Sequence, residues 1–495
     1  MSYLKTFVVA GALLAGCDTP RTQQTVRAPT VADTPTRAQA DNGQYISWRE
    51  HIIDDQALSG VPLRGSDGLV VADLDADGYL DIVSVHESDT TYDGVPRGHV
   101  RIAFGSNDPD VWTNITLGEG AEVGAAEDVV VADFNGDGHP DVIAACELAH
   151  LIYFQNPGPE QARNTPWQRV IPPITLNRGS FIRVFAADFD GDGRVEVVSP
   201  NKGAQNPGAP REKNTISWFD VTDEPLAGNW IEHELTRVIW PINAQTVDLD
   251  GDGDQDVIGG STGEGRIFWF ENTSRGSVTF VEHPIVISGT SVPESFPRPP
   301  RFDGDGALVN GFNMDFADLN GDGRLDIVAS EYRGFLVWLE QPQRISEPWR
   351  LHAIGNLHPD NLVGFGLADI DDDGDLDVMT GAYSRGERAR DGDIDADTPL
   401  GRIAWFANPG TPDEIWIRHD ISRRKRGMYD KFIPRDMDGD GDVDFMGTRG
   451  NSASYDGVFW IEQIRTAQPR KSFAQVREID SEQMPLTPKI PQTDR

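Results

Sequence analysis

The chain has 495 residues with a hydrophobic content of 38%, 12 Trp and 22 Phe, which excludes an intrinsically disordered protein. Its formal net charge of −37 argues against nucleic acid and anionic lipid as partners. With 51 Gly and 33 Pro, the composition indicates many turns, as in all-β folds.

The first 17 residues have the layout of a secretory signal, with one Lys before an apolar run from Phe7 to Leu14. The segment Leu14-Ala15-Gly16-Cys17 resembles the bacterial lipobox, in which the cysteine is acylated and becomes the first residue. This resemblance implies a lipoprotein that is anchored by lipid at Cys17 to a bacterial membrane, at its periplasmic face or at the cell surface. An ordinary signal peptide with a chance cysteine is the alternative.

Residues 18–43 are polar, contain proline and have no period, so the sequence predicts a flexible tether. The one remaining cysteine, Cys146, cannot form an internal disulfide and ends an apolar run, so we expect it to be a small core residue.

A pattern of the form DxDxDGxxD follows and occurs seven times; its first copy begins DLDADGYLD at Asp73. Oxygen atoms at positions one, three, five and nine, with the carbonyl at seven, can surround one hard cation, and Gly at six allows the sharp turn. The pattern predicts up to seven structural Ca²⁺ ions, and an acidic surface turn that needs no metal is the alternative. The predicted ligands are Asp73, Asp75, Asp77 and Asp81; Asp133, Asn135, Asp137 and Asp141; Asp188, Asp190, Asp192 and Glu196; Asp248, Asp250, Asp252 and Asp256; Asp318, Asn320, Asp322 and Asp326; Asp369, Asp371, Asp373 and Asp377; Asp436, Asp438, Asp440 and Asp444.

These loops differ from EF-hands, because position twelve is never Glu and the flanking segments are strand-like. The order of strand, loop and strand resembles the FG-GAP/VCBS repeat, known from the integrin α-subunit propeller and from many secreted bacterial proteins. The copy around Asp369 keeps Phe365-Gly366 before the loop and Gly381-Ala382 after it. The resemblance covers about residues 44–465 and implies a β-propeller.

Two further repeats lie between the loops: an aromatic strand such as Arg266-IFWFE, and a strand that begins at an aromatic residue and often carries a histidine. Both occur seven times, but the first aromatic-histidine strand precedes the first loop and none follows the last aromatic strand, Gly457-VFWIE. We therefore predict an all-β, seven-bladed β-propeller over residues 44–465, with four antiparallel strands per blade and a ring closed by an N-terminal strand. The tail 466–495 is predicted to be mostly disordered. The recurring histidines are expected to pack structurally, because they lie on different blades; they are His51, His233, His283, His352 and His419.

The metal loops join the first two strands of each blade, so the long insertions fall on the opposite face, which we call the loop-rich face. Basic residues there, among them Arg423, Arg424 and Lys431, predict an anion-attracting surface. Polar residues five positions before or after the loops, with some of their neighbours, predict a polar channel mouth that binds a ligand. The candidate ligand-binding residues are His86, Glu87, Asp128, Glu147, Arg183, Asn313, Glu331, Tyr429, Lys431 and Arg449.

The sequence favours a non-catalytic, calcium-stabilised and membrane-tethered binding module for a glycan or protein ligand, including an anionic one. The alternative is a carbohydrate-active enzyme that uses the channel mouth, because similar propellers occur in some polysaccharide lyases and in an aldos-2-ulose dehydratase. The sequence contains no compact catalytic signature, so it does not decide between the binding module and the enzyme.

Overall fold

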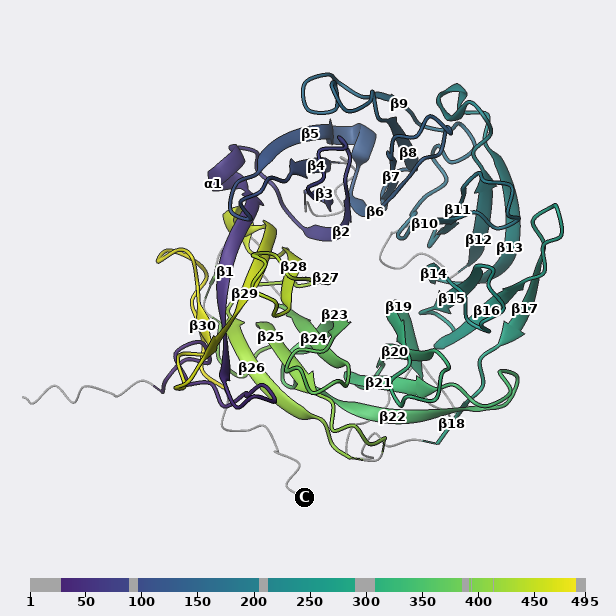
Figure 1. Cartoon of the computed structure of the whole chain (residues 1–495). Coiled ribbons are helices and arrows are strands. Elements are labelled where there is room, and N and C mark those ends of the chain that lie inside the picture. The colour runs from purple at the N-terminus through teal and green to yellow at the C-terminus, as the bar shows by residue number, and fades with distance from the viewer. Residues whose placement is uncertain are drawn as a thin grey trace, which may run out of the picture.

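The computed structural model describes residues 28–88, 97–203, 212–289, 308–384, 391–392, 394–412 and 414–486, and the predicted lipidation site Cys17 lies outside them. The strands form seven separate sheets arranged in a ring (Figure 1). Each sheet contains four antiparallel strands, here called A to D from the axis outwards; they are consecutive in the chain in six sheets, and in the seventh β1 is strand D. The predicted seven-bladed, all-β propeller is therefore confirmed.

The blades follow the chain in order. Blade 1 consists of β2 (Ser66–Ala72), β3 (Asp81–His86), β4 (His99–Phe104) and β5 (Thr113–Glu119). Blade 2 consists of β6 (Ala126–Ala132), β7 (Asp141–Cys146), β8 (Leu151–Gln155) and β9 (Gln168–Val170). Blade 3 consists of β10 (Phe185–Ala187), β11 (Glu196–Pro200), β12 (Lys213–Asp220) and β13 (Ile231–Ile239). Blade 4 consists of β14 (Pro241–Val247), β15 (Asp256–Ser261), β16 (Arg266–Asn272) and β17 (Phe280–Pro284). Blade 5 consists of β19 (Val309–Ala317), β20 (Asp326–Glu331), β21 (Phe335–Glu340) and β22 (Trp349–Asn356), with β18 (Ile287–Ser288) beside β22. Blade 6 consists of β23 (Asn361–Ala368), β24 (Asp377–Tyr383), β25 (Gly401–Ala407) and β26 (Ile417–Arg424). Blade 7 consists of β27 (Phe432–Arg435), β28 (Asp444–Arg449), β29 (Gly457–Thr466) and β1 (Tyr45–Asp55), with β30 (Phe473–Ala474) beside β1.

The ring is closed by the N-terminal strand. β1 pairs antiparallel with β29 from Tyr45↔Thr466 to Asp55↔Gly457, and Figure 1 shows the purple β1 beside the yellow β29. This arrangement confirms the predicted closure and leaves no unpaired C-strand edge in blade 7.

The core lies between neighbouring blades. The second strands are buried on both faces, as in β3 and β7, where all six residues of each are buried. This explains why these segments appear in the sequence as continuous apolar runs instead of alternating patterns. Cys146 belongs to this core, and burial raises its pKa, which confirms that it is a core residue.

The recurring histidines pack against the tryptophans of the adjacent strand. The His233 ring lies 3.9 Å from Trp218, and the His352 ring lies 4.2 Å from Trp338, both nearly parallel. His51, His283 and His419 stack in the same way on Trp460, Trp269 and Trp405. The predicted structural role of these histidines is confirmed.

The predictions of a flexible tether and a disordered tail are wrong for residues 28–43 and 466–486. Val31 N donates to the Met484 carbonyl at 3.0 Å, and β30 pairs in parallel with β1 through Phe473. Val31, Phe473 and Met484 are buried. Isolated apolar residues in a polar segment produce no period, so composition alone cannot reveal that the segment docks.

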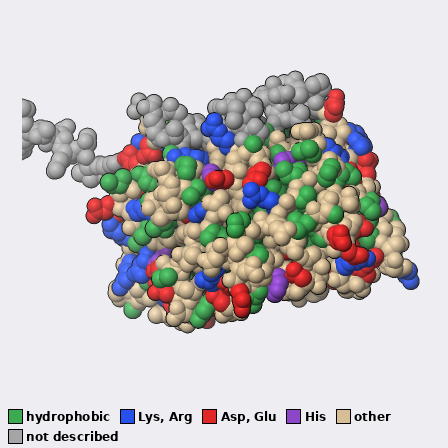
Figure 2. Space-filling model, turned by 90° about the horizontal axis from the view of Figure 1, so that it is seen from above, with side chains coloured by type: hydrophobic (Ala, Val, Ile, Leu, Met, Phe, Trp, Pro, Cys, Tyr) green, Lys and Arg blue, Asp and Glu red, His purple; other side chains and the backbone are tan. Residues whose placement is uncertain are grey.

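The outer flank of the ring carries mixed charges. Figure 2 shows acidic and basic side chains interspersed with hydrophobic ones on this flank. Among the described residues, no helix has the length and apolar character that a membrane crossing requires.

Candidate functional site

The seven acidic loops lie together at one end of the propeller, because each joins strand A to strand B of its blade. The glycine at position six has φ between 84° and 100° in all seven loops. An L-amino acid with a side chain rarely adopts this conformation, so the predicted requirement for glycine is met by the backbone.

The first carboxylate of each loop fixes the loop backbone. Asp73 Oδ1 accepts a hydrogen bond from Asp77 N at 3.2 Å, and Asp73 Oδ2 accepts one from Gly78 N at 3.0 Å. Asp133 makes the same two contacts with Asp137 N and Gly138 N. The loop is therefore preorganised with its carboxylates gathered at one point.

The ninth carboxylate is buried and has a structural role that the sequence did not reveal. Asp256 Oδ2 accepts from Leu249 N at 3.0 Å, and Asp256 Oδ1 accepts from Asn272 N at 2.8 Å. Corresponding pairs of backbone donors hold the ninth carboxylate in four other loops, at Asp81, Asp326, Asp377 and Asp444. This carboxylate thus ties the metal loop to the end of strand C.

An amide side chain after strand C joins each of several loops to the loop of the preceding blade. Asn272 Nδ2 donates to the Phe189 carbonyl at 2.8 Å, and Gln341 Nε2 donates to the Leu249 carbonyl at 2.8 Å. The sequence contains a signal for these contacts, because Asn or Gln recurs after the aromatic strand. The residues are Asn156, Asn272, Gln341 and Gln463, whereas Asn408 at the same place donates to the Leu376 carbonyl of its own blade.

The loops fit a hard divalent cation. Oxygen atoms of Asp73, Asp75 and Asp81 lie within 4.8 Å of one another, and three further loops contain similar groups. The Oδ1 atoms of Asp75, Asp190 and Asp371, all at position three, are buried and have no hydrogen-bond partner in the described part of the chain. A buried carboxylate oxygen without a donor is costly, and a cation at the centre of the loop would remove that cost.

Burial of the ninth carboxylates predicts a pH dependence for the metal-free protein. Burial raises the pKa of Asp81 to about 6 and that of Asp377 to about 8, from an ordinary 3.8. The folded state therefore keeps protons that the unfolded chain has lost, so the contribution of these carboxylates to stability is greatest below about pH 4 and is lost as the pH rises to about 8. We expect a lower unfolding temperature at pH 8 than at pH 5 in excess chelator, and a shallower decline for Asp377→Asn. A flat or rising profile would contradict this expectation.

At the opposite end of the axis, polar side chains from several blades meet. Arg183 Nη2 lies 2.9 Å from Asn313 Oδ1 and 3.1 Å from Asp430 Oδ2, which joins blade 3 to blades 5 and 7. These blades are not neighbours, so the guanidinium spans the propeller axis. Asp128 accepts a hydrogen bond from Val184 N. Burial raises the pKa of Asp128, and the charges of Arg183 and Lys431 lower it in part.

Acidic residues of blades 1 and 2 complete this group. Glu147 forms an ion pair with Lys202, and Asp67, Glu87 and Glu127 place carboxylate oxygens within 4.8 Å of one another. Burial, with the charge of Glu147, raises the pKa of Glu127 to about 8. We call the set the axial cluster; it consists of Asp67, Glu87, Glu127, Asp128, Glu147, Arg183, Lys202, Asn313, Asp430 and Lys431.

Six of the ten predicted ligand-binding residues belong to the axial cluster, and four do not. His86 is buried between Ser66 and Ser84, at 2.6 and 3.1 Å, and burial lowers its pKa well below the usual value. Glu331 accepts from Arg333 Nε at 2.8 Å. Tyr429 packs edge-on against Phe459, and Arg449 pairs with Asp480 at 2.7 Å. These four side chains are committed to the interior of the protein.

The cluster residues Asp67 and Glu127 were missed because strand A is irregular at its start in blades 1 and 2. The β2–β3 register shifts between Ser66 and Leu69, and the β6–β7 register shifts between Ala126 and Asp128. A β-bulge breaks the alternation of side chains, so adjacent residues such as Glu127 and Asp128 both face inwards. A rule that selects one position per strand cannot find both.

The prediction of an anion-attracting surface is wrong for Arg423 and Arg424. Arg423 binds Asp360 with Nε and Nη2, each at 2.8 Å, and Arg424 binds both carboxylate oxygens of Glu50. Both arginine side chains are fully buried, because acidic partners come from distant segments that a local reading of charge ignores. The other predicted insertions, at 86–99, 201–215, 286–312 and 381–401, lie partly outside the described residues, since 89–96, 204–211, 290–307 and 385–390 are not described.

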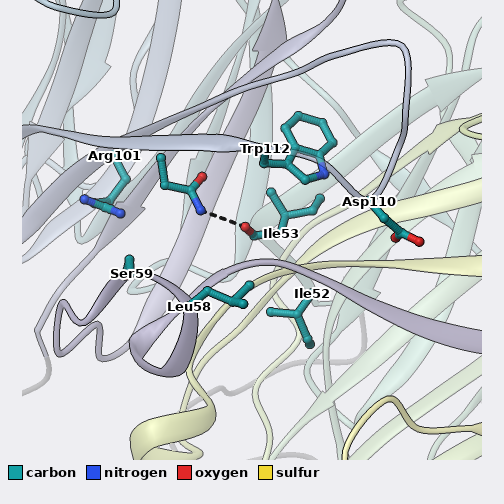
Figure 3. Close-up of a pocket in the computed structure, with 8 residues that line it drawn as sticks. Ile52, Ile53, Leu58, Ser59, Arg101, Asp110 and Trp112 are labelled. Atoms are coloured by element: carbon teal, nitrogen blue, oxygen red, sulfur yellow. Dashed lines mark hydrogen bonds between the residues drawn. The ribbon is translucent and has the colours of Figure 1, made fainter.

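A pocket of about 430 Å³ lies on the flank where blade 7 meets blade 1 (Figure 3). Asn114 Nδ2 donates to the Ile53 carbonyl at 2.9 Å, while Asn114 Oδ1 is buried and meets no hydrogen-bond donor of a described residue. The walls come from the first strand, the short helix α1 (Gln56–Ser59) and blade 1, so no single sequence pattern predicts the pocket. Its lining residues are Ile52, Ile53, Leu58, Ser59, Arg101, Asp110, Trp112 and Asn114.

Comparison with protein families finds FG-GAP-like repeats in residues 73–144, 248–329 and 318–380. The chain therefore carries the repeat that its loops resemble. No curated protein gives a significant match.

The solved structures that this chain matches share little sequence with it. A complex of BBS1N with ARL6DN, soaked with mercury, has 8% identity and a TM-score of 0.43, and the match covers 84% of this chain and 97% of the other. The V. cholerae biofilm matrix protein Bap1 has 10% identity and a TM-score of 0.39, with coverage of 86% and 92%.

Proposed function

We propose that this chain, a seven-bladed propeller with FG-GAP-like repeats, is a calcium-stabilised binding module that engages a glycan or protein ligand on its loop-rich face. The module would be held outside the cytoplasm at a bacterial membrane by lipid at Cys17. One observation carries the proposal. The seven loops and the axial cluster occupy opposite ends of the axis, so cations held in the loops and a ligand at the cluster would not compete for the same groups.

Calcium is supported by the chemistry of the loop donors. All predicted side-chain ligands are carboxylates or amides, which are the hard oxygen donors that Ca²⁺ prefers. Each loop is also braced by its own backbone and by a neighbouring strand, so an ion bound there would stabilise the blade as well as the loop.

The axial cluster supports recognition of a polar ligand. It combines acidic, basic and amide groups within a rigid ring, and Asn313 and Lys431 are partly exposed. Placing polar groups on rigid elements is typical of sites for hydroxyl-rich or charged ligands. No observation favours the enzymatic alternative, since His86 and Glu331 are held in buried contacts.

Ligand binding can be tested with a glycan array and with pull-down from extracellular material. We expect Asn313→Ala and Lys431→Ala to weaken binding of any captured ligand at least tenfold. Arg344→Ala is the matched control, because Arg344 is 78% exposed and lies in the connection between β21 and β22, on the face of the acidic loops. Equal binding by all three variants would contradict the proposed location.

A further inference from the structure

Three carboxylates of the axial cluster form a compact group that is separate from the seven loops. Asp67 lies at the start of β2, Glu87 follows β3, and Glu127 lies at the start of β6. All three are therefore at the ends of strands opposite the acidic loops. One oxygen atom from each lies within 4.8 Å of the other two, and only Glu87 is partly exposed.

Asp67 has no ion-pair partner within the described ranges of the chain. Its side chain is 4% exposed, and its Oδ2 atom is buried without a hydrogen-bond partner among the described residues. The nearby cations are used elsewhere, since Arg183 binds Asn313 and Asp430, and Lys202 binds Glu147. An uncompensated buried carboxylate beside two others is strongly unfavourable unless a positive group joins them.

The close contact of blades 1 and 2 holds the group in place. A Cβ atom added at Gly68 would lie 2.8 Å from Asp128 Oδ1 and 2.9 Å from the Glu127 carbonyl. Glycine at this position allows the inner strands of the two blades to touch, and the shifted registers turn Asp67 and Glu127 towards the same point. The carboxylates are thus brought together by the fold and not by the flexibility of surface side chains.

We propose that Asp67, Glu87 and Glu127 bind one hard divalent cation at the end of the axis opposite the seven loops. Three carboxylate oxygens are donors of the kind that Ca²⁺, Mg²⁺ and Mn²⁺ take, with water completing the coordination on the partly exposed side of Glu87. The donors come from three segments of two blades, so the site contains no DxDxDG pattern. The cation would neutralise the group and link the first blade to the second.

The site can be tested with Mn²⁺ as the probe, on crystals of the full chain soaked in Mn²⁺ and by counting bound ions after equilibrium dialysis. We expect anomalous density between the three carboxylates in the wild type. We also expect the loss of one bound ion per chain in Asp67→Asn, which is isosteric. Glu127→Gln serves as a second variant in case the first does not fold. Glu119→Gln, an exposed carboxylate at the end of β5 on the same face, should bind as many ions as the wild type.

Absence of density at the group while the loops are filled, or an unchanged ion count in both variants, would overturn this proposal and leave calcium binding by the loops intact. Empty loops with a filled group would instead contradict the proposed role of the loops. A second readout follows from charge repulsion. In chelator, Asp67→Asn should unfold at a higher temperature than the wild type, because one of three like charges is gone, and an equal or lower temperature would count against the cation site.

Discussion

Replacing Asp360 by alanine is expected to lower the free energy of unfolding by about 3–5 kcal/mol, the range for removing one partner of a buried ion pair. Asp360 accepts hydrogen bonds from Arg402 Nε at 2.6 Å and from Arg423 Nε at 2.8 Å. Both arginine side chains are 0% exposed. Without Asp360, two guanidinium groups lose a shared carboxylate in a region that water does not reach.

Urea denaturation at constant calcium would measure this loss. The matched control is Glu347→Ala, which removes the partner of the exposed Arg344 and is expected to change the free energy of unfolding by less than about 1 kcal/mol. If both variants lost the same stability, the buried arginines would not depend on Asp360 and the account of this region would be wrong.

Removal of calcium is expected to produce the largest loss of stability. A ligand that binds only the folded state contributes about 2.7 kcal/mol per site at a concentration 100 times its Kd, so emptying several loops removes a large share of the total. The carboxylates that remain would then repel one another. Calorimetry and limited proteolysis in excess chelator should show a lower unfolding temperature and faster cleavage, both reversed by adding Ca²⁺.

A single-loop variant makes the calcium test sharper. Asp371→Asn alters a loop in which the Oδ1 atom of that residue is buried and has no partner among the residues that the structure describes, and should reduce the calcium count by one ion per chain. Asp223→Asn is the control, because this carboxylate is 80% exposed and lies outside the loops. If excess chelator did not change the unfolding temperature, stabilisation by calcium would be refuted.

The fold was predictable because its signals are local and repeated. The spacing of Asp73, Asp77, Gly78 and Asp81 lies within nine residues, and its recurrence sets the number of blades. Ring closure followed from counting strands, since one type of strand appears before the first loop and is missing after the last. The expected packing of His352 and its counterparts followed from their places on different blades.

The candidate site was predictable only in part, because it depends on contacts between distant segments. Arg423 resembles a surface cation until Asp360 is placed beside it. Arg449 likewise depends on Asp480, in a tail whose composition suggests disorder. Glu127 was hidden by a bulge that cancels the alternation of strand residues. For Arg423 and Arg449 the partner lies dozens of residues away in the sequence. For Glu127 a local irregularity of the strand breaks the alternation, so no repeating pattern reveals it.

The pairing of β1 with β29 has a consequence for synthesis. It brings together residues such as Arg49 and Glu462, which are 413 positions apart. A growing polypeptide therefore cannot complete the last blade until nearly the whole chain has emerged, and a chain shortened at its N-terminus presents the bare backbone of β29. That strand can accept the first segment of a second copy, so chains whose own first segment is missing or still unpaired are expected to pair with a second copy, which size-exclusion chromatography would detect.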